Sequence, residues 1–172
     1  MRSSYPPFWR SCLLLALGLT ALAGAGCRTT PTPPKYFVQF YTEARGDSGI
    51  AFTLPESKLE YRREIEPFAT AAKVTDIQLG TVNVTGMKRY CVFFQFDAMA
   101  TRDLYQATGA NIGRRIFLFA NDKPMGVRYV DDTIQNGQLF VFVEISDPEK
   151  LQQFVTDLQA SQKQLADIKA SR

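Results

Sequence analysis

Carboxylates, lysines and cysteines are the residues that this sequence offers for catalysis, because it contains no histidine. The absence excludes the Ser-His-Asp and Cys-His arrangements that activate a nucleophile, as well as histidine-based metal sites. Cys91 lies in an apolar stretch, which favours a buried structural thiol over a redox or nucleophilic one. Asp131 and Asp132 point to opposite faces of an expected strand, so they do not form a cation site. We therefore predict no catalytic residue, no metal and no cofactor.

Cys27 stands at the end of a segment that is typical of secreted proteins. Two arginines flank or precede an apolar run, 13–22, which leads into Ala-Gly-Ala-Gly-Cys at 23–27. A positive flank, a short apolar run and small residues at a cleavage site form a secretory signal, and the run is too short to span a bilayer. With a cysteine directly after the small residues, the segment resembles a bacterial lipobox, although Gly24 stands where leucine is commoner.

The resemblance to a lipobox implies that the signal, residues 1–26, is cleaved and that Cys27 carries a diacylglycerol thioether and an acylated amine, for example with palmitate. Several acyl chains anchor a protein stably in a membrane, whereas a single chain binds only marginally. Arg28, in place of aspartate, implies sorting to the outer membrane, where the protein would face the periplasm. Ordinary secretion with a free Cys27 is the alternative interpretation.

Removal of residues 1–26 leaves 146 residues with 18 basic and 17 acidic side chains. This nearly balanced charge gives no reason to expect nucleic acid as a partner. The first residues of this part, 27–35, contain three prolines and are predicted to form an extended tether. The remainder, 36–168, is long enough for a single domain with a hydrophobic core.

Aromatic, β-branched and alternating residues predict strands in the first half of the domain, at 36–43, 50–54, 58–65 and 76–84. The strand 58–65 carries mostly charged residues on one face, so we expect a half-buried or edge strand there. A tight turn is expected at Thr85-Gly86, after the last of these strands.

The second half of the domain begins with a strand, 90–96, whose two faces are both apolar. We therefore expect it to be the central strand of the sheet. Asp97 is placed to cap a helix that extends to about residue 111. Further strands are expected at 115–120, 126–134 and 139–145. A type I′ hairpin at Asn136-Gly137 is predicted to join the last two strands.

The last helix is expected to begin near Ser146, which is placed to form a capping box with Glu149. Together these elements predict an α+β fold, in which an antiparallel sheet of six to eight strands carries two helices on one face. The order of elements from Tyr90 onward permits a ferredoxin-like arrangement of the C-terminal half.

Several short motifs follow one another between residues 90 and 158. They are Phe-Gln-Phe-Asp at 94–97, Asn-Ile-Gly-Arg-Arg at 111–115, Asn-Asp-Lys-Pro at 121–124 and Ile-Gln-Asn-Gly at 134–137. In this order they are similar to the head subdomain in the first periplasmic region of the SecD/SecDF protein-export membrane proteins. The N-terminal half also looks like that of small bacterial lipoproteins that carry such a head.

The resemblance to the SecD/SecDF head implies a domain that contacts unfolded or partly folded polypeptide in the periplasm. Members of that family span the membrane several times and couple export to proton movement. We expect no membrane helix in this chain after removal of the signal, so proton coupling and export are not carried over to it.

Four basic residues are the best candidates for a binding site: Lys88 and Arg89 in one expected hairpin, and Arg114 and Arg115 before a strand. Such a cluster suits carboxylates or lipid phosphates at a membrane surface. Solvent-exposed strand edges, with no binding role for these residues, are the alternative interpretation.

We therefore expect a non-enzymatic, lipid-anchored cell-envelope domain that binds a polypeptide or protein partner, for instance by pairing at an exposed strand edge. If Phe140 and Phe142 face away from the helices, they would form an exposed apolar contact surface. The alternative function is a module that binds a small molecule or a lipid within the layers of sheet and helix.

Overall fold

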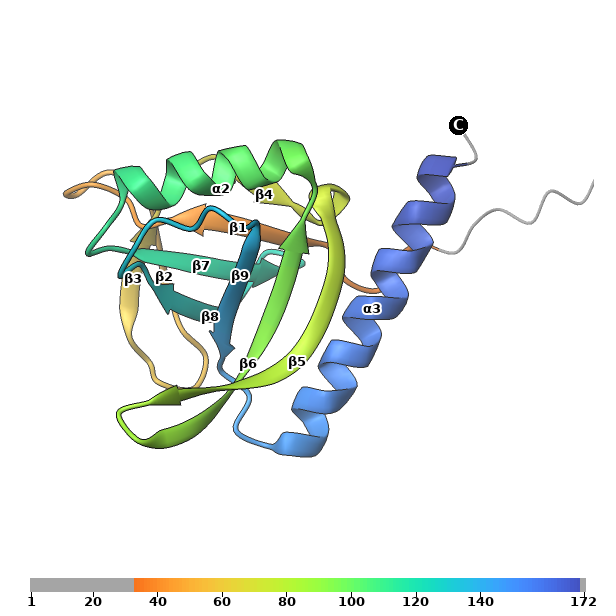
Figure 1. Cartoon of the computed structure of the whole chain (residues 1–172). Helices are drawn as coiled ribbons and strands as arrows, with labels where there is room; N and C mark the ends of the chain where they lie inside the picture. Colours follow the sequence, from red (N-terminus) through yellow and green to blue (C-terminus); the bar gives the residue numbers. More distant parts are fainter. Residues whose placement is uncertain (1–32, 171–172) are drawn as a thin grey trace, which may run out of the picture. The chain divides into compact units, whose positions relative to one another are not determined.

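The computed structural model describes residues 33–170, which form an antiparallel sheet of seven strands, a two-stranded sheet and two α-helices (Figure 1). This arrangement confirms the predicted α+β class. Neither helix in this range has the length and apolar character of a membrane span. The predicted signal, 1–26, and the predicted lipidation site at Cys27 lie outside the described residues.

The strands of the described part are β1 (Val38–Thr42), β2 (Ile50–Thr53), β3 (Glu60–Arg63), β4 (Ala69–Thr70), β5 (Val74–Val84), β6 (Met87–Phe96), β7 (Arg115–Ala120), β8 (Lys123–Tyr129) and β9 (Gln138–Val143). The helices are the short 3₁₀ helix η1 (Ala71–Lys73) and the α-helices α2 (Ala98–Ala110) and α3 (Pro148–Ala170). β2 and β3 pair with each other as a hairpin, separate from the large sheet.

The seven strands of the large sheet lie in the order β4-β1-β7-β8-β9-β6-β5, and neighbouring strands are antiparallel. The centre of the sheet is therefore β8, whereas β6, the strand predicted to be central, lies next to the edge strand β5. Its two apolar faces are present as predicted, since Val92 and Phe94 are buried on one side and Cys91 on the other. Burial on both faces depends on what packs above and below a strand, and so does not reveal its place in the sheet.

β8 and β9 are joined through only two residue pairs, Gly126 with Val143 and Val127 with Phe142. Figure 1 shows the sheet bending at this seam, so that β5, β6 and β9 cross the direction of β7 and β8. A Cβ atom at Gly126 would lie 2.3 Å from the carbonyl oxygen of Phe142, so the close approach of the two backbones requires glycine. The bend gives the sheet an inner face, which surrounds the core, and an outer face.

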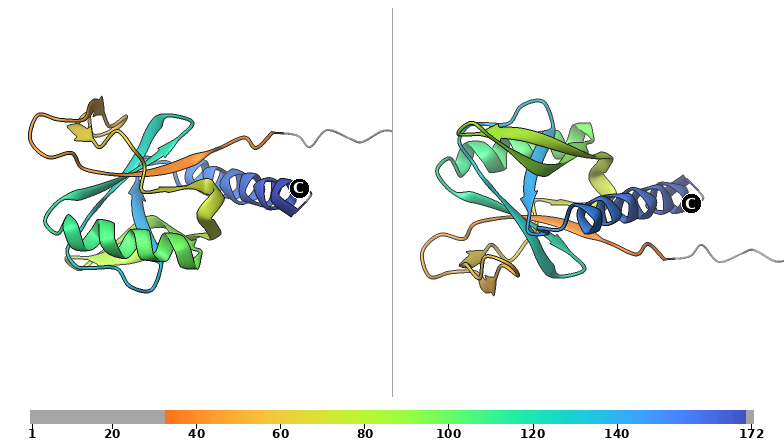
Figure 2. Two further views of the ribbon diagram at one scale, coloured as in Figure 1. Left: turned by 90° about the horizontal axis from the view of Figure 1, so that it is seen from above. Right: turned by 90° about the horizontal axis from the view of Figure 1, so that it is seen from below.

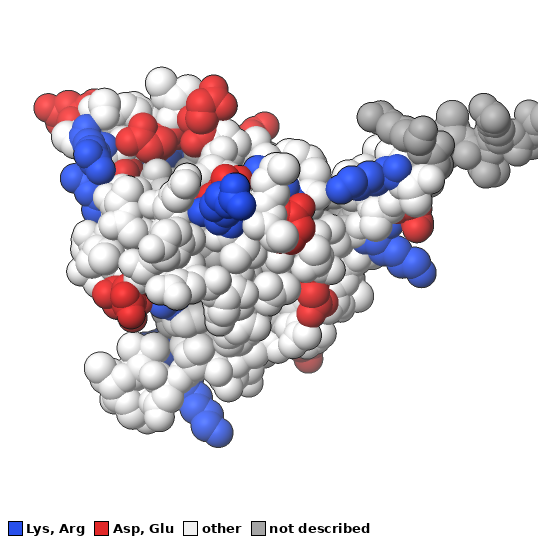
Figure 3. Space-filling view, turned by 45° about the horizontal axis from the view of Figure 1, so that its top comes forward, with Lys and Arg blue, Asp and Glu red and all other residues white. Residues whose placement is uncertain are grey.

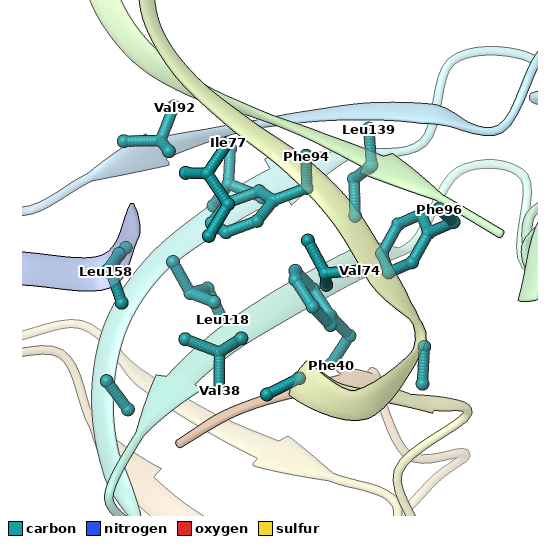
Figure 4. Close-up of a cluster of buried hydrophobic side chains, with 14 of the residues drawn as sticks. Val38, Phe40, Val74, Ile77, Val92, Phe94, Phe96, Leu118, Leu139 and Leu158 are labelled. Atoms are coloured by element: carbon teal, nitrogen blue, oxygen red, sulfur yellow. The ribbon is translucent and has the colours of Figure 1, made fainter. Parts of the chain in front are cut away.

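The inner face of the sheet and both helices enclose the main hydrophobic core, part of which is drawn in Figure 4. Phe40 of β1 packs edge-on against Phe94 and Phe96 of β6, with ring centroids 5.0 Å apart in each pair. These contacts connect the two halves of the bent sheet. The helices contribute the buried residues Ala100, Leu104, Leu151, Phe154, Val155 and Leu158. Both helices thus pack on one face of the sheet, as predicted.

Residues 130–137 form a loop between β8 and β9, where the sequence pattern predicts a strand and a two-residue hairpin. β8 is displaced toward the N-terminus relative to the predicted strand 126–134. Of the predicted turn pair Asn136-Gly137, only Gly137 has a positive φ, 70°. The loop is bound to α2 instead, because the amide of Ile134 donates a hydrogen bond of 3.0 Å to the hydroxyl of Thr108.

Two other connections of this sheet are two-residue hairpins. Both of their central residues have a positive φ, as a type I′ turn requires. Thr85-Gly86 joins β5 to β6 with φ of 50° and 84°. Asn121-Asp122 joins β7 to β8 with φ of 50° and 63°. The predicted tight turn at Thr85-Gly86 is therefore confirmed.

α2 begins after Asp97, whose carboxylate accepts a hydrogen bond of 2.8 Å from the amide of Ala100, as predicted. The helix leads from β6 to β7. In a ferredoxin-like split unit, one strand lies between the two strands that such a helix joins. Here both β9 and β8 lie between β6 and β7, so the strand order of the C-terminal half differs from that arrangement.

α3 is capped by Asp147 rather than by the predicted capping box at Ser146. One carboxylate oxygen of Asp147 accepts hydrogen bonds from the amides of Glu149, at 2.9 Å, and Lys150, at 3.3 Å. These amide donors hold the pKa of Asp147 below its usual value. The Ser146 hydroxyl instead donates to the carboxylate of Glu56, in the segment after β2.

The start of the domain is fixed against α3. Lys35 forms an ion pair of 2.5 Å with Asp157, and this hydrogen bond raises the pKa of Lys35. The amide of Tyr36 donates to the hydroxyl of Ser161 at 3.0 Å, and the Tyr36 ring lies edge-on to Phe154 at 5.2 Å. These contacts attach residues 35 and 36 to α3.

Candidate functional site

The outer face of the sheet carries two groups of aromatic side chains. In the first group, Tyr41 of β1 and Phe117 and Phe119 of β7 are buried. Phe52 of β2 packs edge-on against Phe117 and Phe119, with centroid distances of 4.8 Å and 5.0 Å, and Tyr61 of β3 lies 5.2 Å from Phe117. Figure 2 shows the β2–β3 hairpin on the side of β1 opposite α2. We call these five residues the covered aromatic cluster.

The second group consists of Phe93 of β6 and Phe140 and Phe142 of β9, which we call the outer aromatic face. Ring centroids are 5.7 Å apart between Phe93 and Phe140, and 5.6 Å apart between Phe140 and Phe142. The Phe93 ring lies over Gly80 of β5, where a Cβ atom would be 2.4 Å from it. All three side chains are half-buried, and none belongs to the core that the helices cover. The condition set for Phe140 and Phe142 is thus met in orientation, while a contact surface at these rings stays a prediction.

Arg128 of β8 lies at one end of the outer aromatic face, next to Phe140. Its guanidinium carbon lies 3.5 Å from the centre of the Phe140 ring, a cation–π contact, and its Nη2 donates a hydrogen bond of 2.8 Å to Asp131. Arg128 is only 9% exposed. Its Nε and Nη1 atoms are buried and have no hydrogen-bond partner among residues 33–170. The sequence patterns did not point to Arg128, and an arginine among the otherwise uncharged residues 124–130 was the signal that could have found it.

Two open pockets adjoin the outer aromatic face. The first, of about 590 Å³, is lined by Arg128, Phe93, Phe140, Val82 and polar residues of the 130–137 loop. The second, of about 530 Å³, lies at the other end. Its lining includes Phe142, Val84, Lys88, Arg89 and Tyr90. The run of three rings therefore connects a pocket with a buried arginine to a pocket with exposed basic residues.

The four basic candidates do not form one cluster. Arg115 lies opposite Tyr129 at the end of β8, whereas Lys88 and Arg89 lie in the β5–β6 hairpin beyond the pairing with β9. Arg114 donates to the carbonyl of Ala44 at 3.1 Å. Figure 3 shows basic and acidic side chains intermixed on the face in view, without a continuous basic area.

Arg115 is held in place by Glu43 of the segment after β1. The guanidinium donates to both carboxylate oxygens of Glu43 at 3.2 Å, and the same carboxylate accepts from the Arg115 amide at 3.0 Å. The guanidinium also lies 4.9 Å from the centre of the Tyr61 ring. Arg115 thus helps to hold the β2–β3 hairpin, while Lys88 and Arg89 are the basic candidates that line a pocket.

Cys91 lies on the same face of β6 as Phe93 and is completely buried. Burial raises the pKa of its thiol to about 11, against a smaller opposing effect from the charge of Arg128. A thiol in this environment is protonated and poorly reactive at neutral pH. The interpretation of Cys91 as a buried structural cysteine agrees with this geometry.

The paired aspartates provide no cation site in the described part of the chain, where no group of acidic, cysteine or histidine side chains could hold a metal ion. Asp131 pairs with Arg128, and Asp132 accepts a hydrogen bond of 2.6 Å from the amide of Thr133. The Asp131 carboxylate therefore connects the 130–137 loop to β8, and the Asp132 carboxylate forms a hydrogen bond within that loop.

A further pocket, of about 750 Å³, lies between β5 and the second half of α3. Here α3 covers part of the sheet edge, since Gln159 donates a hydrogen bond of 2.7 Å to the carbonyl of Ile77 and Gln162 donates to that of Val74. Farther along β5, Thr81 and Asn83 are exposed. This open pocket is one place where the alternative small-molecule function would find space.

No family model matches this sequence, and no curated protein is similar to it at a significant level. Two solved structures of SecDF are similar in fold. SecDF in its super-membrane-facing form aligns with a TM-score of 0.55 at 16% identity, over 76% of this chain and 19% of that chain. A structure of SecDF as a membrane component that enhances protein export aligns with a TM-score of 0.53 at 15% identity, over 95% of this chain and 71% of that chain.

At these identities the similarity concerns the fold alone, and this chain spans only 19% of the length of the first SecDF structure. The resemblance predicted from the motifs between residues 90 and 158 is confirmed at that level, and the structural match extends well beyond this range. The domain therefore has the fold of a part of SecDF.

Proposed function

We propose that this chain is a lipid-anchored protein of the bacterial cell envelope whose domain binds polypeptide segments and catalyses no reaction. The outer aromatic face carries the proposal, because its three neighbouring phenylalanine rings are half-buried, whereas the β2–β3 hairpin packs over the covered aromatic cluster. Rigid aromatic surfaces of this kind supply much of the binding energy in protein interfaces. They also accept side chains of many sequences.

The free end of β5 supports a polypeptide as the ligand. Thr81 and Asn83 are exposed in the edge strand, next to the half-buried Val82 and one strand away from Phe93. An extended segment could pair with this edge through main-chain hydrogen bonds and place alternate side chains on the outer aromatic face. Lys88 and Arg89, beside the second pocket, would attract acidic residues of the same segment, whereas Arg114 and Arg115 would offer a separate basic contact.

The fold adds a second line of support. One SecDF structure with this fold belongs to a membrane component that enhances protein export. A domain of the same fold held at a membrane by a lipid would meet polypeptides in the envelope. The absence of histidine from the sequence and the buried, protonated thiol of Cys91 favour a role in binding rather than catalysis.

Binding is tested with the full chain, purified in detergent, and a fluorescein-labelled unstructured peptide rich in phenylalanine and leucine. We expect saturable binding by fluorescence anisotropy, and at least about tenfold weaker binding by the double variant Phe140→Ser and Phe142→Ser, because interface hot spots commonly exceed this cost. Tyr105→Ser is the matched control, since Tyr105 is 48% exposed on α2, outside the site. Absence of peptide binding, or equal loss in the control, would refute the proposal.

The lipid anchor is tested separately by metabolic labelling with a fatty acid. Label should enter the wild-type chain and a Cys12→Ser control, but not Cys27→Ser, because the proposed acylation site is the cysteine after the small residues at 23–26. Fractionation of the labelled cells should place the protein in the outer membrane. Equal labelling of the Cys27→Ser chain would contradict the anchor without affecting the test of peptide binding.

A further inference from the structure

Arg128 is the residue of the described part whose buried side-chain donors lack partners. A buried guanidinium is costly unless its N–H groups are hydrogen-bonded, and each unsatisfied donor carries a desolvation penalty. In Arg128 only Nη2 has an acceptor, on Asp131, while Nε and Nη1 have none within residues 33–170. The side chain lines the pocket of about 590 Å³ at the end of the outer aromatic face. Because both atoms are buried, an acceptor that a ligand brings reaches them only when the side chains that cover them shift.

The orientation of the guanidinium is set before any ligand arrives. The Phe140 ring supports one face of it at 3.5 Å, and the hydrogen bond to Asp131 fixes one end. A donor that is already oriented loses little entropy on binding, so its full strength is available to the ligand. This arrangement distinguishes Arg128 from the exposed basic residues near the second pocket.

The charge around Arg128 indicates which acceptor fits. Asp131 already balances the guanidinium, and Asp132 also lines the pocket. A carboxylate or phosphate in the pocket would meet the second aspartate, and like charges at close range are unfavourable. The remaining polar lining, Gln135, Asn136 and Gln138, is uncharged. A neutral carbonyl oxygen satisfies the guanidinium donors without this repulsion.

The apolar part of the pocket indicates what the carbonyl is attached to. Phe93, Phe140 and Val82 form an apolar wall beside the arginine. An uncharged, apolar side chain can pack on this wall while a neighbouring amide reaches the guanidinium and the amide side chains of the loop. A peptide residue with an aromatic or aliphatic side chain has both parts.

We propose that the Arg128 pocket binds one uncharged, apolar residue of a polypeptide, whose main-chain carbonyl accepts a hydrogen bond from Nε or Nη1 of Arg128 and whose side chain packs on Phe93 and Phe140. The inference rests on the proposed polypeptide-binding function and gives it a specificity: the pocket selects apolar residues and rejects acidic ones. The long hydrophobic segments of unfolded chains meet this requirement, whereas acidic linkers do not.

The test uses the full chain in detergent and three labelled peptides that differ at one central position, which is phenylalanine, asparagine or aspartate. We expect affinity to fall in that order, and the step from asparagine to aspartate isolates the charge. Arg128→Lys, which keeps the charge but loses the planar donors, should weaken binding of the phenylalanine peptide by about tenfold, the effect of losing one charge-assisted hydrogen bond. Arg102→Lys, on the exposed surface of α2, is the matched control and should bind like the wild type.

A second measurement uses only the wild-type chain, so the proposal stays testable if the Arg128→Lys variant misfolds. In the wild-type chain, the NMR signal of the Arg128 Nε–H should shift when the phenylalanine peptide is added and stay unchanged with the aspartate peptide. If peptides bind but neither the signal nor the affinity depends on Arg128, or the aspartate peptide binds best, the pocket assignment is overturned while polypeptide binding stands. If no peptide binds the wild type, both proposals are overturned.

Discussion

The covered aromatic cluster and the outer aromatic face have similar chemistry but different surroundings. Each consists of phenylalanine or tyrosine rings on the outer side of the sheet, and each has an arginine stacked on a ring. Arg63 lies 3.8 Å from the centre of the Tyr41 ring, and Arg128 lies 3.5 Å from that of Phe140. The β2–β3 hairpin buries the first group, whereas the second group lines two open pockets.

The difference shows that the role of an aromatic residue in a strand depends on whether another segment covers it. Phe117 is fully buried because Phe52 and Tyr61 return from another segment to cover it, so its role is stability. Phe140 has the same alternating position in its strand but retains contact with solvent. An apolar surface that residues 33–170 leave uncovered, beside a buried arginine with two donors unpartnered in that range, is a candidate for binding.

The first prediction separates stability from binding in the two groups. Phe117→Ala should lower the free energy of unfolding by about 3–5 kcal/mol, the usual loss for a buried phenylalanine. Phe140→Ala should lower it by only about 1–2 kcal/mol, because part of its ring is already in water, and should weaken peptide binding. Chemical denaturation and anisotropy provide the two readouts. Similar losses of stability for both variants would remove the distinction between the groups.

The second prediction converts the covered cluster into an exposed one. Phe52→Ala removes the ring that packs on Phe117 and Phe119, and should lower the free energy of unfolding by about 2–3 kcal/mol, less than for a fully buried ring. Binding of a hydrophobic dye should increase relative to the wild type. Tyr105→Ala, an exposed aromatic on α2, should change neither quantity. An unchanged dye signal would mean that Phe52 of the β2–β3 hairpin does not shield the covered aromatic cluster from solvent.

The third prediction concerns the seam at which the sheet bends between the two groups. Gly126→Ala should destabilise the domain by about 1–3 kcal/mol, because the added Cβ atom would overlap the backbone of Phe142. Gly109→Ala is the matched control: it lies within α2, its nearest contact would be 3.7 Å from Thr133, and it should stabilise the helix by about 0.5 kcal/mol. Denaturant midpoints compare the two variants. Equal midpoints would show that the seam tolerates a side chain.

The fourth prediction probes the buried side of the outer aromatic face through Cys91. Iodoacetamide should not modify Cys91 in the folded chain at neutral pH, and mass spectrometry of peptides should find it modified only after unfolding. The pKa of this thiol is about 11 when folded, above its unfolded value of about 8.5. Its contribution to stability is therefore complete below pH 8.5 and is lost as the pH rises toward 11. Rapid modification of the folded chain would place Cys91 at an accessible surface.

Local patterns in the sequence were sufficient for several elements. The alternation in the strands, the Asp97 cap and the turn at Thr85-Gly86 depend on neighbouring residues only, and all three are confirmed. Predictions that depended on distant contacts differed more. The Asn136-Gly137 pair lies in a loop bound to α2, and Ser146 caps no helix because Glu56 accepts its hydroxyl and Asp147 takes its place.

The candidate site was predicted only in part. The sequence patterns left open whether Phe140 and Phe142 face away from the helices, and the structure places them on that side, half-buried. The contact of Arg128 with Phe140 joins β8 to β9 across the bend. The expected basic cluster was divided by the same bend, since its two halves lie at different ends of the sheet. Distances between strands that are remote in sequence cannot be inferred from residue types.

The amino-acid sequence by itself determined the α+β class, the alternation of apolar faces and the lack of histidine chemistry, because these depend on composition and on the periods of helix and strand. Tertiary structure alone decided the strand order, the bend at Gly126 and which aromatic group the β2–β3 hairpin covers. The physical reason is that burial of an outer face is a property of two segments in contact, and neither segment encodes its partner in its own pattern.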